Sequence, residues 1–138
     1  MLGPLQDAWD AWSGVQEQVS AKPWYHFPTV IAIQFAEAAE HKAHGQPERA
    51  ANEIVDIMSV CLNWLRWMGY TTPKSVATII RARAANRYAG QTQAILDKYQ
   101  QKYADADPEN TTAKRWETIS NNTTGAMPHP TEKPMDTS

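Results

Sequence analysis

The chain has 138 residues and a formal charge of −2, which fits one domain without the basic surface that duplex nucleic acid or an anionic membrane would require. Its longest apolar run is too short to span a bilayer, and its first residues lack the apolar core of a signal peptide, so we expect a cytoplasmic protein. The single cysteine, Cys61, cannot form an internal disulfide, and its apolar neighbours predict a buried, unreactive thiol.

The spacing of the apolar residues predicts an all-α chain, because it follows the helical period and nowhere shows the alternation of a β-strand. Leu5, Trp9 and Trp12 would share one face of a first amphipathic helix over about residues 5–20. An aromatic connector over residues 22–28 follows and leads into the next helix.

Proline and glycine mark the ends of two central helices. Pro28 and Gly45 bound the second helix, and Pro47 and Gly69 bound the third, since proline is favoured in the first helical turn and glycine just after the last. Both helices are apolar over more than one face, which is typical of central helices or of helices at a subunit interface. We therefore expect a homo-oligomer.

Three further segments complete the chain. A Thr-Pro pair at Thr72 predicts the start of a fourth helix that runs to about Ala89, and a short fifth helical segment follows over residues 92–103. Residues 104–138 are rich in Thr, Asn, Pro and Asp and poor in aliphatic residues, so we expect a disordered tail. The predicted organisation is an all-α domain over residues 1–103 followed by this polar tail.

The second and third helices each carry a pair of acids three residues apart, inside otherwise apolar sequence. The four acids are Glu37, Glu40, Glu53 and Asp56. Residues three apart lie on the same side of a helix, so each pair can direct two carboxylates at one point. Carboxylates are rarely buried without a partner and repel one another, which indicates a cation between them. Oxygen ligands of this kind suit Mg²⁺ or Mn²⁺, and Mg²⁺ usually accompanies a phosphate-bearing substrate.

Basic side chains offer an alternative explanation of these acids. In a plain helical bundle the four carboxylates would form salt bridges with Arg81, Arg83 or Arg87. Arg83 and Arg87 also lie four residues apart on one helical face, a spacing that suits them to hold phosphate oxygens.

Several polar and aromatic residues are candidates for ligand binding and for packing alike. Asn63 lies seven residues after Asp56 on the same side of the third helix, where it would either orient a ligand or satisfy a neighbouring helical group. Trp24 and His26 in the connector could stack on and hydrogen-bond a base, whereas the tryptophans within the helices are typical of a core or an interface. We expect Arg66 to be structural.

With these residues in view, the chain resembles the MazG-like all-α nucleoside triphosphate pyrophosphohydrolases. That superfamily includes dCTP pyrophosphatases, dimeric dUTPases and phosphoribosyl-ATP pyrophosphohydrolases. The sequence signature of the superfamily is E-x-x-E, a spacer and then E-x-x-D. The resemblance covers roughly residues 9–103. The segments that carry it are Glu37-Ala-Ala-Glu40, Glu53-Ile-Val-Asp56, the run from Asp56-Ile-Met58 to Asn63, Arg66 and Gly69, the connector Trp24-Tyr25-His26-Phe27-Pro28 and the fourth-helix run from Arg83 to Arg87-Tyr88.

The resemblance implies a four-helix bundle that assembles as a homodimer or homotetramer and hydrolyses a (d)NTP to a (d)NMP and pyrophosphate with Mg²⁺ as cofactor. It implies that the four acids hold the metal, with Glu40 or Glu53 activating the attacking water. Neither nucleic acid nor a membrane is an expected partner. The substrate-binding residues that it implies are Arg83, Arg87, Tyr88, Asn63, Trp24 and His26.

A function of a different class is the alternative. The segment from His41 to His44 follows the first acid pair where the family has acidic or apolar residues, which favours a non-catalytic module of the same fold. Such a module would bind nucleotides or a partner protein. Within the enzymes, the alternative substrate is phosphoribosyl-ATP.

Overall fold

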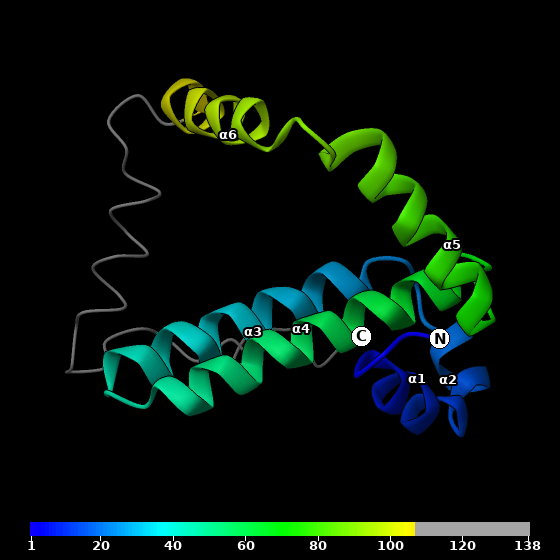
Figure 1. Cartoon of the computed structure of the whole chain (residues 1–138). Coiled ribbons are helices and arrows are strands. Elements are labelled where there is room, and N and C mark those ends of the chain that lie inside the picture. Colours follow the sequence, from blue (N-terminus) through cyan, green and yellow to red (C-terminus); the bar gives the residue numbers. More distant parts are fainter. Residues whose placement is uncertain (107–138) are drawn as a thin grey trace.

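The computed structural model describes residues 1–106, and all regular structure in that part of the chain is helical (Figure 1). The all-α prediction is therefore confirmed, while the predicted tail beyond residue 106 lies outside the described residues. None of the helices in residues 1–106 is long and apolar enough to cross a membrane. In chain order the elements are α1 (Leu5–Ser13), α2 (Gln16–Ser20), α3 (His26–Ala43), α4 (Pro47–Trp67), α5 (Pro73–Arg83), the π-helical turn η1 (Ala84–Tyr88) and α6 (Thr92–Ala106).

The prediction of one helix over residues 5–20 is wrong, because the segment is broken into α1 and α2. The Ser13 hydroxyl donates to the carbonyl of Trp9 at 3.1 Å, and Val15 leaves the helical region with φ −122° and ψ 23°. Gly14, between them, lowers the cost of ending a helix because glycine has the highest conformational entropy of any residue. The apolar spacing continues across the break, which is why periodicity alone predicts a single helix.

The long helices α3 and α4 form an antiparallel hairpin that is the body of the fold (Figure 1). Its turn is tight because Gly45 adopts φ 68°, a left-handed conformation that glycine accepts without strain. The amides of Gly45 and Gln46 then donate to the carbonyls of Lys42 and His41 at 3.1 and 2.9 Å, which is the Schellman arrangement. Pro47 occupies the first turn of α4. The turn therefore sets the register in which the two helices face each other.

Aromatic packing closes the other end of the hairpin. Phe27 is completely buried and stacks on Trp64 with ring centroids 5.8 Å apart and planes 10° apart. Trp67 also contacts Phe27, at 5.8 Å, and its indole nitrogen donates to the carbonyl of Lys22 at 2.8 Å. Trp64 and Trp67 thus have the packing role expected of tryptophans in the helices. The connector is held to the end of α4 by the same contacts.

A second cluster joins α1 and the start of α5 to α4. Trp9, Leu62 and Val76 are buried against one another. The start of α5 is fixed by a reciprocal hydrogen-bond pair between Thr72 and Ser75, as the Thr-Pro signal predicts. Cys61, on α4, is exposed, so the prediction of a buried thiol is wrong.

Beyond this cluster, α5, η1 and α6 lead away from the hairpin (Figure 1). The predicted fourth helix to Ala89 ends as the π-helical turn η1 in place of regular α-helix. The predicted fifth segment is α6, which continues to Ala106. Its side chains Leu96, Tyr99 and Tyr103 are 61%, 48% and 63% exposed.

The two phenylalanines of the chain offer a matched test of the aromatic contacts, because both lie on α3. Phe27→Ala removes a completely buried ring and should lower the free energy of unfolding by about 3–5 kcal/mol. Phe35→Ala makes the same chemical change at a ring that is 50% exposed, so its effect should be much smaller. Urea unfolding followed by circular dichroism measures both; equal losses would contradict the packing described here.

Candidate functional site

The hairpin brings acids from α3 and α4 together. Glu53 of α4 lies within hydrogen-bonding reach of Glu37 of α3 and of Asp56, one turn further along α4. A basic side chain also reaches this group, since His41 Nε2 lies 3.5 Å from Glu53 Oε1. His41 is in turn positioned by Gln46, whose side-chain oxygen lies 3.2 Å from His41 Nδ1. We call Glu37, Glu53 and Asp56 the acid cluster.

Two carboxyl groups in the acid cluster hold protons more tightly than usual. Burial raises the pKa of Glu53, and hydrogen bonding with and repulsion by Glu37 raise it further, while His41 acts in the opposite direction. Partial burial raises the pKa of Asp56, and the charge of Glu53 adds to this effect. Burial first and the neighbouring carboxylates second therefore disfavour the charged forms of these two groups, and a bound cation would offset both effects.

Glu40 lies one helical turn beyond Glu37 and is half-buried. Its backbone carbonyl lies 2.8 Å from His44 Nδ1, and its carboxylate is not among the groups that shift the pKa of Glu53 or Asp56. Of the four predicted metal ligands, Glu37, Glu53 and Asp56 are therefore neighbours.

As the side chains stand, no group of three or more His, Cys, Asp or Glu within residues 1–106 is placed to hold a metal ion. The donor chemistry nevertheless suits a hard divalent cation, because it consists of carboxylate oxygens on two facing helices. Small side-chain rotations would be needed to close the group around such a cation.

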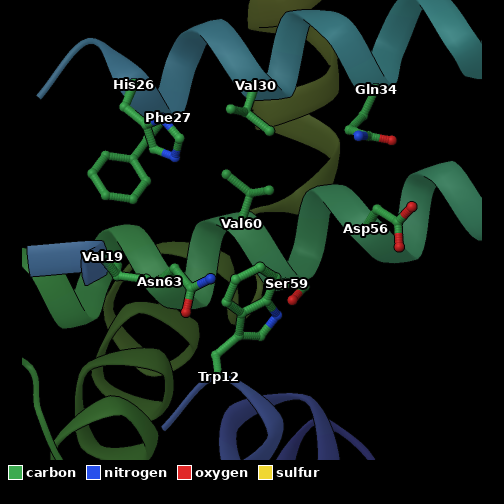
Figure 2. Close-up of a pocket in the computed structure, with 10 residues that line it drawn as sticks. All are labelled: Trp12, Val19, His26, Phe27, Val30, Gln34, Asp56, Ser59, Val60 and Asn63. Carbon is green, nitrogen blue, oxygen red and sulfur yellow. The ribbon is translucent and has the colours of Figure 1, made fainter. Parts of the chain in front are cut away.

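A cavity of about 410 Å³ lies between the helices next to the acid cluster (Figure 2). Gln34 and Asp56 lie toward one end of it, and His26, Phe27 and Asn63 lie toward the other (Figure 2). The cavity thus has an acidic end and an end lined by an aromatic ring, an imidazole and an amide. Its lining residues are Trp12, Val19, His26, Phe27, Val30, Gln34, Asp56, Ser59, Val60 and Asn63.

Two polar atoms in the cavity wall are buried without a hydrogen-bond partner in the described part of the chain: His26 Nδ1 and Gln34 Oε1. Burial lowers the pKa of His26, and the charge of Lys22 lowers it further, which favours the neutral imidazole. Buried polar atoms nearly always have partners, which makes a wall with unsatisfied groups a candidate ligand site.

Two of the predicted substrate-binding residues, His26 and Asn63, therefore share a cavity with the predicted metal ligand Asp56. Trp24 does not line it: its ring is 59% exposed and packs edge-on against Tyr25 with centroids 6.3 Å apart. The connector thus contributes its histidine to the cavity and presents its tryptophan to the surface.

Arg83, Arg87 and Tyr88 are not brought to the acid cluster in this arrangement of the chain. They lie on α5 and η1, which follow each other without a break and lead away from the hairpin (Figure 1). Arg83 and Tyr88 are exposed and Arg87 is half-buried.

The cavity also contains residues that the sequence analysis did not select. Gln34 precedes Glu37 by three residues on α3 and could have been found as a polar side chain on the acid-bearing side of an apolar helix. Ser59 similarly lies between Asp56 and Asn63 on α4. Trp12 carried no such signal, because it reaches the cavity from α1, and only the tertiary packing places it there.

Comparison of the chain with protein-family models, with curated proteins and with solved structures gave no match. The resemblance to the MazG-like superfamily therefore rests on the sequence motifs themselves.

The raised pKa of Glu53 predicts how stability depends on pH. The folded-state pKa of Glu53 lies above its ordinary value of 4.5. Its contribution to the free energy of unfolding is therefore fully present below pH 4.5 and is lost as the pH rises through the folded-state pKa. Glu53→Gln cannot ionise, so it should melt at a higher temperature than the wild type at pH 7, and this difference should shrink toward pH 4. Thermal melts in EDTA measure it.

The control for this change is Glu48→Gln. Glu48 is exposed in the first turn of α4, where a negative charge is mildly favourable to the helix. Neutralising it should leave the melting temperature at pH 7 unchanged or slightly lower. A Glu53 variant that behaves like the Glu48 variant would show that the acid cluster carries no repulsion.

Proposed function

We propose that the protein is a Mg²⁺-dependent nucleoside triphosphate pyrophosphohydrolase that cleaves a (d)NTP to a (d)NMP and pyrophosphate. The observation that supports this most is the polarity of the cavity, which has the Asp56 carboxylate and Gln34 at one end and His26, Phe27 and Asn63 at the other. A volume of about 410 Å³ is within the range of small-molecule sites. A nucleotide has the matching polarity, with a planar base at one end and phosphates at the other.

The base would lie at the end formed by His26, Phe27 and Asn63. Aromatic walls bind planar rings by stacking and by burial of apolar surface. Neutral His26 and the amide of Asn63 would supply the hydrogen bonds that orient the base. Trp12 would close the cavity from α1.

The triphosphate would then extend toward Asp56. Glu37, Glu40, Glu53 and Asp56 would hold Mg²⁺, which when bound would neutralise charge on the phosphate oxygens. Water attacks the α-phosphorus, the bond from that phosphorus to the bridging oxygen breaks, and pyrophosphate leaves. Glu40 or Glu53 would accept the proton of this water.

The proposed assembly is a homodimer or homotetramer. The outer face of the hairpin leaves Phe35, Ile54, Val55 and Met58 between 43% and 55% exposed, more apolar surface than two helices usually present to water. An oligomer would also give Arg83 and Arg87 a route to phosphates, because α5 and η1, which carry them, lead away from the acids of their own chain. Light scattering tests the assembly, and a monomer at all concentrations would exclude it.

The enzymatic proposal predicts pyrophosphate release from at least one (d)NTP in Mg²⁺ or Mn²⁺, and none in EDTA. Glu53→Gln and Asp56→Asn should each reduce kcat/KM by at least about 100-fold, because each removes a charge that acts on the transition state. Glu48→Gln, at an exposed acid of the same helix, should retain wild-type activity. Full activity in the two cluster variants would exclude the proposed site.

A non-catalytic nucleotide-binding module is the second candidate. It is favoured by the observation that the acids in residues 1–106 form no group ready to hold a metal. The same assay separates the two, provided that phosphoribosyl-ATP is included in the substrate panel. Nucleotide binding without pyrophosphate release from any substrate would favour the module.

A further inference from the structure

Asn63 is held in one orientation by a buried arginine. Asn63 is 6% exposed and lines the cavity, and its side-chain oxygen accepts a hydrogen bond from Arg66 Nη1 at 3.3 Å. A guanidinium has only donors, so it can be satisfied by the oxygen of the amide and never by its nitrogen. The position of Arg66 therefore dictates which end of the Asn63 amide faces it.

Arg66 is itself fixed by α1. Its guanidinium carbon lies 3.7 Å from the centroid of the Trp9 ring, and Nη2 donates to the carbonyl of Trp9 at 2.9 Å and to the hydroxyl of Ser13 at 3.3 Å. The whole residue is 1% exposed. A planar group stacked on an aromatic ring and bonded at both terminal nitrogens has little freedom to turn.

The other end of the amide is the one presented to a ligand. No hydrogen bond within residues 1–106 uses Asn63 Nδ2, and Figure 2 shows this nitrogen on the side of the amide nearer to Val60 and the oxygen on the side away from α3. The cavity therefore offers two N–H donors at this point. A donor pair in a buried wall selects a ligand atom that accepts a hydrogen bond.

We infer that Asn63 is a specificity-determining residue that donates to a carbonyl oxygen of the bound base, and that Arg66 is the positioning residue that sets this donor. The inference rests on the proposed function for the identity of the ligand as a nucleotide. It favours bases that present a carbonyl oxygen to the Asn63 donors and disfavours adenine, whose exocyclic group is itself a donor and whose acceptors are ring nitrogens only. It assigns Arg66 a role in ligand choice in addition to packing.

Inosine and adenosine provide the test, because at position 6 inosine carries a carbonyl oxygen and adenosine an amino group. Each nucleoside is titrated into the full chain in EDTA, with calorimetry or tryptophan fluorescence as the readout. The wild type should bind inosine at least about tenfold more tightly than adenosine. Equal affinities, or binding of neither nucleoside, would overturn the inference.

Asn63→Asp is the variant that keeps the fold and changes the chemistry. Its carboxylate can still accept from Arg66, and now as an ion pair, so the melting temperature should not fall. The same carboxylate presents an acceptor to the cavity, so the preference for inosine should be lost or reversed. A purely structural role for Asn63 would leave the ratio of the two affinities unchanged, and that result would contradict the assignment.

Arg66→Lys tests the positioning role while leaving Asn63 in place. An ammonium group lacks the planar fork that bonds Asn63, Trp9 and Ser13 together, so the amide should turn and the inosine preference should fall toward equal affinities. Only variant protein that melts cooperatively is compared, and a wild-type ratio in such protein would exclude the role of Arg66.

These titrations do not depend on catalysis. Pyrophosphate release without a base preference would support the proposed function and overturn the inference. A base preference without pyrophosphate release would support the inference and overturn the proposed enzymatic function.

Discussion

The packing of α3 on α4 is the constraint on which the rest of the structure depends. It is fixed at one end by the turn through Gly45 and at the other by the stacking of Phe27 on Trp64. Two ends held in this way leave no freedom to shift the register by a helical turn, because a shift would unstack the rings or open the turn. The acids, the cavity and the buried amide all take their relative positions from this register.

The acid cluster lowers the stability of the same hairpin at neutral pH. A chain optimised only for stability would not place Glu53 in hydrogen-bonding contact with Glu37 and within the field of Asp56. Groups that destabilise a fold at neutral pH tend to concentrate where a ligand is bound, and the pocket beside them supplies the space for one. The unpartnered atoms of His26 and Gln34 add a second cost of the same kind in the same place.

The outer surfaces of the hairpin and of α6 expose large apolar side chains. The apolar side chains Phe35 and Ile54 are exposed on the hairpin, and Leu96 and Tyr103 are exposed on α6. A groove of about 770 Å³, lined largely by alanines of α3 and α4 with Phe35 and Ile54 at its sides, follows the same face. Small residues allow another helix to approach closely, which is the physical basis for placing the proposed oligomer interface there.

The sequence by itself determined the helical class, the two central helices and the acid pairs, because period, proline and glycine are local signals. It did not determine the break at Gly14, since apolar spacing continues across it, nor the exposure of Cys61, since burial depends on which neighbours arrive. The entry of Trp12 into the cavity and the contacts of Arg66 with Trp9 and Ser13 follow from the tertiary structure alone. The two contacts of Arg66 join residues 57 and 53 positions apart, and a local pattern cannot encode a distance set by the packing of whole helices.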